Sequence, residues 1–166
     1  MAAAIRFRAA QIEDVSIMAE LVARCNDIYK TWAPAGWSPP VDIAQREQEH
    51  LRQRLNDASA DALVATKGDQ IIAFVMWRPS RRATDVADLS LLFVDPAFWG
   101  IGIGRELLLA AERSMLQASF SQAELWVPLE NARARRLYER NGWRESSQSR
   151  EHSQLGIELQ RYEKSL

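Results

Sequence analysis

The feature that most constrains this 166-residue chain is a glycine-rich turn between an apolar segment and an amphipathic one. The stretch Leu89–Met115 reads LSLLFVDPAFWGIGIGRELLLAAERSM, with glycine at positions 100, 102 and 104. Glycine lacks a Cβ atom, so the backbone can bend there and present its N–H groups to a ligand. The spacing of Ile103, Leu107 and Ala111 predicts a helix that begins at this turn. Because the start of a helix carries partial positive charge, the segment favours a bound anion such as phosphate.

Two common phosphate-binding motifs of similar composition do not match this segment. A dinucleotide site of the Rossmann type needs G-x-G-x-x-G directly after a strand and an acidic residue at the end of the next strand. Here the spacing is G-x-G-x-G, residues 95–99 separate the strand from the glycines, and Glu124 precedes the next apolar run. A P-loop needs Gly-Lys followed by Ser or Thr, and the sequence has neither after these glycines. The turn therefore indicates another kind of phosphate site.

Composition limits the classes of function. Hydrophobic residues make up 47% of the chain, which predicts one globular domain over residues 1–166. With 21 basic and 22 acidic residues, the formal net charge is −1, so we expect no nucleic-acid or membrane partner. A single cysteine, Cys25, and the lack of a signal-peptide-like start or a long apolar run predict a cytoplasmic protein. His50 and His152 lack metal-ligand spacing, so no metal site is expected.

The order of expected elements predicts an α/β fold with a mainly antiparallel sheet. Helical spacing predicts helices over residues 13–28 and 42–55, from the glycine turn to about 119, and over 131–140. Apolar runs and alternation predict strands over residues 4–8, 62–66, 71–77, 85–94, 124–127, 144–149 and 156–162. The helix over 42–55 is mostly polar with a narrow apolar seam of Ile43, Leu51 and Leu55, so we expect it to lie at the surface as a cover.

Two sequence blocks resemble those of the GNAT superfamily of acyl-CoA-dependent N-acetyltransferases. The family's Val-x-Pro and Q/R-x-x-G-x-G/A are similar to Val94-Asp95-Pro96 and Trp99-Gly100-Ile101-Gly102-Ile103-Gly104. Its N-x-x-A-x-x-L-Y-x-x-x-G-F is similar to Asn131, Ala134, Leu137, Tyr138 and Gly142-Trp143. The resemblance is sharp from about Asp88 to Trp143, and Trp99 departs from it, because the family usually has Gln or Arg there. It implies a mixed, mainly antiparallel splayed sheet, flanked by helices, around the cofactor.

The resemblance also implies the cosubstrate acetyl-CoA and the residues that hold it. Its pantetheine arm would pair with the strand ending at Val94, a backbone N–H near Val94 would face the thioester oxygen, and its phosphates would meet the glycine turn. Asn131 would either bind the pantetheine amide or cap the helix that it opens. The residues implied at the cofactor are Leu92, Phe93, Val94, Trp99, Gly100, Ile101, Gly102, Ile103, Gly104, Arg105, Asn131 and Tyr138.

Two side chains are candidates for catalysis. Tyr138 matches the family's proton-donating tyrosine, and a proton transfer from a phenol of pKa about 10 to a thiolate of about 8.5 costs roughly 2 kcal/mol. The alternative is a packing tyrosine whose hydroxyl only binds the cofactor sulfur. Asp88 stands where many family members have a glutamate that helps deprotonate the amine. Since a carboxylate is a much weaker base than an alkylamine, Asp88 would act through water or by orienting the acceptor. The alternative is an exposed strand carboxylate, with Asp85 as a nearby competitor.

These observations together predict an acetyltransferase that transfers an acetyl group from acetyl-CoA to a primary amine by direct attack in a ternary complex. Trp32 and Trp37 lie in the Pro- and Gly-containing segment 31–40, where the family's acceptor site forms, and they favour a small-molecule amine. Two alternatives remain: a non-catalytic acyl-CoA sensor, which would not need Tyr138, and acetylation of a protein N-terminus or lysine. The family also suggests a homodimer, and it implies no metal.

Overall fold

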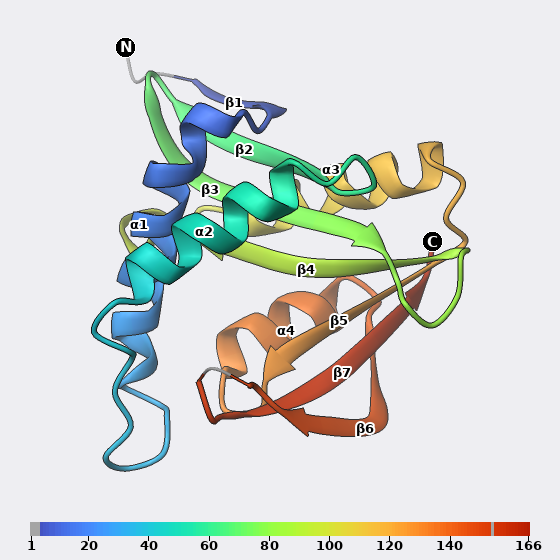
Figure 1. Ribbon diagram of the computed structural model, residues 1–166. Helices are drawn as coiled ribbons and strands as arrows, with labels where there is room; N and C mark the ends of the chain where they lie inside the picture. The colour runs from blue at the N-terminus through green and yellow to red at the C-terminus, as the bar shows by residue number, and fades with distance from the viewer. Residues whose placement is uncertain (1–3, 154) are drawn as a thin grey trace.

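A computed structural model describes residues 4–153 and 155–166, and its centre is one seven-stranded sheet (Figure 1). The strand order is β1-β2-β3-β4-β5-β7-β6, and every pairing is antiparallel except that of β4 with β5, which is parallel. The strands are β1 Ile5–Ala9, β2 Asp61–Lys67, β3 Gln70–Pro79, β4 Val86–Val94, β5 Gln122–Pro128, β6 Arg144–Glu151 and β7 Glu158–Ser165. The expected α/β fold with a mainly antiparallel sheet is confirmed.

The helices cover both faces of this sheet. They are α1 Val15–Tyr29, α2 Ile43–Leu55, α3 Ile103–Gln117 and α4 Ala132–Arg140, with short 3₁₀ turns η1 Ile12–Asp14 and η2 Pro96–Phe98. Helices α1 and α2 lie on one face and α3 on the other (Figure 1). The central strand β3 is accordingly apolar on both sides, with Phe74 and Met76 facing α1 and Ile72 and Val75 facing α3. Within the described residues, no helix combines the length and the hydropathy needed to cross a membrane.

The polar helix α2 has its apolar seam inward, as predicted. Ile43 and Leu51 are buried, and Leu55 packs against the core beneath α1. Asp42 occupies the N-cap position, but its side chain does not cap the helix. Its carboxylate instead accepts a hydrogen bond from Nε of Arg46 at 2.7 Å. The helix therefore begins where the sequence predicts, although the carboxylate interacts with a side chain one turn further on.

Strands β4 and β5 pair over only part of their length. The parallel ladder joins Val86–Leu89 to Gln122–Leu125 and then stops. Beyond it, β4 continues along β3 to Val94, while β5 continues along β7 to Pro128. The register between β3 and β4 shifts next to Leu89, which leaves Ser90 as an extra residue, as in a β-bulge. The predicted splayed sheet is thus present, and the split begins just after the bulge.

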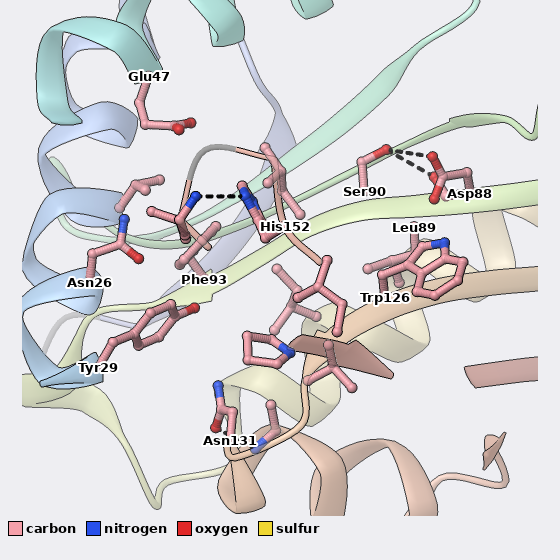
Figure 2. A pocket seen from close by; sticks show the side chains of 18 of the residues that line it. Asn26, Tyr29, Glu47, Asp88, Leu89, Ser90, Phe93, Trp126, Asn131 and His152 are labelled. Carbon is pink, nitrogen blue, oxygen red and sulfur yellow. Dashed lines mark hydrogen bonds between the residues drawn. The ribbon is translucent and has the colours of Figure 1, made fainter. Parts of the chain in front are cut away.

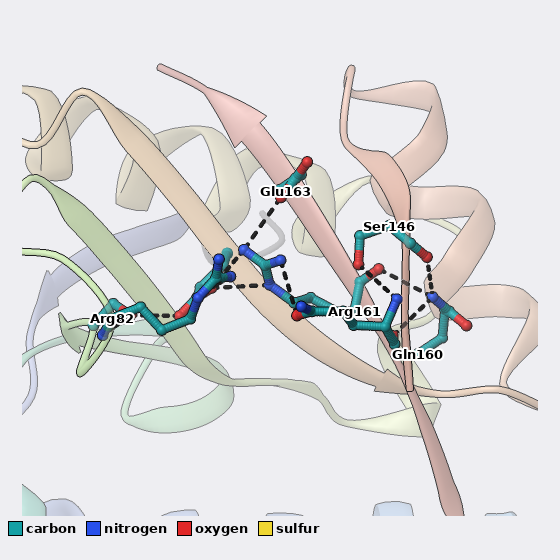
Figure 3. A network of polar contacts seen from close by, with 8 residues as sticks. Arg82, Ser146, Gln160, Arg161 and Glu163 are labelled. Atoms are coloured by element: carbon teal, nitrogen blue, oxygen red, sulfur yellow. Dashed lines mark hydrogen bonds and ion pairs between the residues drawn. The ribbon is translucent and has the colours of Figure 1, made fainter. Parts of the chain in front are cut away.

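A buried ionic network anchors β5 at the end where it pairs with β4 (Figure 3). Glu124 of β5 is 5% exposed, and its carboxylate accepts hydrogen bonds from the Ser80 hydroxyl and from Arg82 at 2.9 Å. Arg161 of β7 is 6% exposed and donates to the same carboxylate through Nε at 2.9 Å and Nη2 at 2.8 Å. Arg161 also donates to the side chain of Gln148 on β6 at 3.2 Å. The network therefore ties β5, β6, β7 and the segment after β3.

Candidate active site

The glycine turn has the backbone that its sequence requires. Gly100 and Gly102 have φ of +82° and +90°, a region that favours glycine, and Gly102 is the N-cap of α3. A Cβ atom at either position would have nothing within 4 Å, so both face open space. Gly104 serves packing instead, because a Cβ there would lie 3.5 Å from side-chain atoms of Val94 and Leu137. The first N–H groups of α3 therefore lie at an open turn that can accept an anion.

The side chain of Trp99 links the glycine turn to the end of β4. Its indole N–H donates to the backbone carbonyl of Val94 at 2.8 Å. The guanidinium carbon of Arg133, from the first turn of α4, lies 4.4 Å from the centroid of the Trp99 ring. Trp99 therefore braces the end of β4, and Arg133 brings a cation beside the glycines that the sequence analysis did not single out.

A cavity of about 230 Å³ lies where β4 and β5 separate (Figure 2). Its walls include residues 88–93 of β4, 126–128 of β5, parts of α4 and residues of α1 and α2. Of the predicted site residues, it brings together Asp88, Leu92, Phe93, Asn131 and Tyr138. Val94, Trp99 and the glycine turn lie outside the cavity wall, where β4 leads through η2 into α3. Arg105 is exposed in the first turn of α3.

Tyr138 lies deep in the wall of this cavity. It is 6% exposed, and its ring centroid lies 5.9 Å from that of Trp143 and 6.4 Å from that of Tyr162. Burial raises the pKa of Tyr138 well above the usual value of a phenol, so the hydroxyl stays protonated at neutral pH. Asn131 opens α4, and its Oδ1 accepts a hydrogen bond from the backbone N–H of Ala134 at 3.1 Å. The capping role of Asn131 is therefore shown, while its contact with the cofactor stays a prediction.

Asp88 is half-buried in the same wall, where neighbouring side chains contact its carboxylate. Nε of Arg78 lies 3.5 Å from Oδ2, and the Ser90 hydroxyl donates to the same oxygen at 3.3 Å. Asp85, the competitor, is exposed, accepts a hydrogen bond from the Ser121 hydroxyl at 2.8 Å and does not line the cavity. The geometry thus favours Asp88 over Asp85 for any role in the cavity.

The two loop tryptophans surround Tyr29 and do not line the cavity themselves. The ring centroid of Tyr29 lies 4.4 Å from that of Trp32 and 6.2 Å from that of Trp37. The indole N–H of Trp37 donates to the carbonyl of Leu155 at 2.8 Å, which joins the 31–40 segment to the β6–β7 connection. Tyr29 does line the cavity, so Trp32 and Trp37 support its wall through their contacts with the Tyr29 ring.

Several cavity residues were missed by the sequence analysis. Glu47 stands in the apolar seam of α2, four residues after Ile43 and four before Leu51, and a carboxylate in that seam was a usable signal. Asn26 lies on the buried face of α1. His152 lines the cavity from the β6–β7 connection, where its Nδ1 accepts the N–H of Leu155 at 3.2 Å (Figure 2). Burial lowers the pKa of His152, which favours the neutral imidazole.

The single cysteine of the chain is buried, and its thiol is unreactive. Cys25 is 5% exposed, its thiol donates to the carbonyl of Val94 at 3.3 Å, and burial raises its pKa to about 12. A thiol in this state is a poor nucleophile at neutral pH. Within residues 4–153 and 155–166, no cluster of three or more His, Cys, Asp or Glu could hold a metal ion.

Residues 22–143 match the model of the Acetyltransferase (GNAT) family. The chain belongs to this family. It is 36% identical over 113 residues to the mycothiol acetyltransferase of Beutenbergia cavernae, a match that covers 66% of this chain and 37% of that protein. The chain thus spans little more than a third of the length of that curated relative.

Solved structures of GNAT proteins share the whole fold. The PaiA N-acetyltransferase of Thermoplasma acidophilum, solved in complex with coenzyme A, is 20% identical with a TM-score of 0.77 and covers 98% of this chain and 99% of its own. The ribosomal-protein-alanine N-acetyltransferase of Brucella melitensis is 22% identical with a TM-score of 0.72 and covers 97% and 99%. One relative is named for mycothiol and another for the alanine of a ribosomal protein, so the GNAT fold leaves the acceptor open.

Proposed function

We propose that this GNAT chain transfers an acetyl group from acetyl-CoA to a primary amine, by direct attack in a ternary complex. The observation that carries the proposal is the split between β4 and β5, which opens beside the glycine turn and forms one cavity with Tyr138 in its wall. The unreactive Cys25 thiol favours direct attack over transfer through a cysteine. Acetyl-CoA would supply the acetyl group as a thioester.

The cofactor would lie along the open part of β4 and end at the glycine turn. Backbone groups of Leu92, Phe93 and Val94 would hold the pantetheine arm, because β5 has left this stretch of β4 without a partner on that side. The N–H groups of residues 100–105 would bind the pyrophosphate at the positive end of α3. An N–H donor aimed at the thioester oxygen contributes roughly two to three orders of magnitude in rate.

Tyr138 is the proposed proton donor to the departing thiolate. Its raised pKa keeps the proton on the phenol until the thiolate forms, although the same burial makes the phenolate product less favourable. Asp88 is the proposed carboxylate that helps to remove the amine proton, through water. Its contacts with Arg78 and Ser90 fix its position in the wall. A small-molecule amine in the cytoplasm is the proposed acceptor, entering beside the wall that Trp32 and Trp37 support.

The binding half of the proposal is tested with Gly102→Glu. Acetyl-CoA should raise the Tm of the native chain, since a ligand that binds only the folded state stabilises it. Gly102→Glu should abolish this shift, because it places bulk and negative charge in the open space at the start of α3. Gly36→Glu is the matched control: Gly36 has φ +82° and equally open surroundings, but it lies in the 31–40 segment. A folded Gly102→Glu chain with a full acetyl-CoA shift would contradict the phosphate site.

A further inference from the structure

Most charged side chains in the cavity wall are matched by a partner. The charged side chains that line it are those of Glu47, Arg54, Arg78, Asp88 and Arg150. Arg78 and Asp88 contact one another at 3.5 Å. The guanidinium carbon of Arg150 lies 4.2 Å from the centroid of the Trp126 ring. Glu47 and Arg54, both on α2, have no oppositely charged side chain of the described cavity wall within 4.0 Å.

Glu47 and Arg54 are desolvated without a close ion pair. The Glu47 side chain is 14% exposed, and its contact with His50 is 4.0 Å long. Arg54 is half-buried and has no carboxylate within 4.0 Å among the described residues. Burial raises the pKa of Glu47 and lowers that of Arg54, so each charge is held at the expense of solvation. A ligand carrying the opposite charges would offset that loss.

A buried amide at the Glu47 end of the cavity also lacks a partner. Asn26 is 2% exposed and lines the cavity, and among the described residues its Oδ1 accepts no hydrogen bond. An unpaired buried acceptor is unfavourable unless a ligand supplies the donor. Figure 2 shows Asn26 on α1 and Glu47 on α2 at the same end of the cavity, with Tyr29 beside Asn26. Two hydrogen-bond acceptors thus converge there, which suits the N–H groups of an amine.

Glu47 and Arg54 stand at different places along the α2 wall of the cavity. Tyr29, which lies beside Asn26, lines the same cavity as Glu47 and Tyr138, and burial raises the pKa of its phenol. Arg54 has the cavity residues Arg78 and Asp88 within electrostatic range, and Glu47 as well. Glu47 and Arg54 are seven residues apart on one helix face, about 10 Å along the axis. The α2 wall of the cavity therefore has an anionic residue, Glu47, and a cationic residue, Arg54, two helical turns apart.

We propose that the acceptor is an ampholyte whose amine is held by Glu47 and Asn26 and whose anionic group is bound by Arg54. The inference rests on the proposed acetyl transfer and adds the acceptor's chemical class. Because Asp88 acts on Arg54, it would reach an amine held at Glu47 only through water, as in the proposed transfer. A guanidinium binds carboxylate or phosphate through paired hydrogen bonds, so either anion fits. Because Glu47 and Arg54 are two turns apart, the amine and the anion are separated by a chain of several atoms, unlike those of an α-amino acid.

A series of matched acceptors tests this assignment. ω-Amino acids of increasing chain length, the n-alkylamines of the same lengths and ω-aminoalkyl phosphates are compared by release of free CoA. We expect one length of ω-amino acid or aminoalkyl phosphate to exceed its alkylamine by ten-fold or more in kcat/KM, and the better of the two identifies the anion. Arg54→Gln should remove this advantage through KM, with kcat nearly unchanged. Arg52→Gln is the control, because Arg52 is exposed in the same last turn and does not line the cavity.

Stability and binding separate this role from a structural one. Glu47→Gln and Arg54→Gln each remove a desolvated charge, so the Tm at pH 7 should stay level or rise, while Glu47→Gln raises the KM of every amine. The preferred ω-amino compound should also raise the Tm of the native chain and not that of Arg54→Gln, whether or not it is acetylated. The ampholyte assignment is wrong if amines with and without an anionic group bind and react alike. It is also wrong if neither the ω-amino acids nor the ω-aminoalkyl phosphates stabilise the native chain. Binding of the ω-amino compound without any acetylation would instead refute the proposed function.

Discussion

Replacing Tyr138 by phenylalanine should separate proton delivery from packing. The ring of Tyr138 packs beside Trp143 and Tyr162, and phenylalanine keeps that ring. The Tyr138 hydroxyl forms no hydrogen bond with another described residue, so its removal should change the free energy of unfolding by less than about 1 kcal/mol. General acid catalysis is worth roughly 10²–10⁴-fold, and a thiolate leaves fairly well unaided. We therefore expect kcat to fall by about 10²-fold with little change in acetyl-CoA affinity.

The assay is single-turnover acetylation of a verified amine, with acetyl-CoA affinity measured separately by thermal shift. Tyr162→Phe makes the same chemical change in the same ring cluster and is the control. The Tyr162 hydroxyl donates to Glu139 at 2.8 Å and accepts from Nε of Arg135 at 3.0 Å, and Tyr162 does not line the cavity. Tyr162→Phe should thus lose about 1–3 kcal/mol of stability and keep its kcat.

Two results would refute this reasoning about Tyr138. A wild-type single-turnover rate in Tyr138→Phe would mean that water or the acceptor's own ammonium protonates the thiolate. A raised KM with unchanged kcat would mean that the hydroxyl only binds the cofactor. The raised pKa of Tyr138 adds a pH criterion, because the phenol stays protonated beyond its usual range. As pH rises, the native rate should therefore show no fall from loss of this proton below about pH 10.

Two further substitutions test the turn and the closed end of the sheet. Trp99→Gln restores the residue type usual in the GNAT family, and titration should show equal or tighter CoA affinity. A ten-fold or greater loss of affinity in a folded chain would show that the Trp99 hydrogen bond to Val94 contributes more to binding than a glutamine side chain does. Arg161→Met leaves the buried carboxylate of Glu124 without one of its two arginines. Urea denaturation should show that the free energy of unfolding falls by about 3–5 kcal/mol. A fall below about 1 kcal/mol would mean that Arg82 alone compensates the charge of Glu124.

The turn and helix start of the proposed cofactor side could be predicted because local backbone demands specify them. Gly100 and Gly102 occupy positive-φ positions that other residues rarely adopt, and Asn131 caps the helix that its motif opens. Such features depend on residues that are close in sequence, so their spacing can be recognised in the sequence itself. Tyr138 follows from the same motif, since helical spacing carries it from Asn131 into the cavity wall.

The proposed acceptor side could not be predicted in the same way, because tertiary packing assembles it. Asn26, Glu47 and Arg54 come from two helices that meet the cavity only through their packing on the sheet. Only Glu47 left a local signal, as a carboxylate within an apolar seam. His152 reaches the cavity from the β6–β7 connection, whose path depends on where the sheet opens. The aromatic residues Trp32 and Trp37 of the 31–40 segment contact Tyr29, and Tyr29 is the ring that lines the cavity, so their role at the acceptor stays a prediction.

Strand β5 contributes residues to both the buried network and the cavity wall. Side chains alternate along β5, so Glu124 and Trp126 point to the same face of the sheet, one at the paired end and one at the split. Glu124 is held by Ser80, Arg82 and Arg161, which fixes β5 against β7 and the segment after β3. Breaking that pairing would leave a buried charge uncompensated, so the strands cannot part there without a large penalty. Trp126, two residues on, has no such network and lies in the cavity wall beneath Arg150. Glu124 therefore anchors β5 at the closed end of the sheet, two residues before the wall of the proposed site.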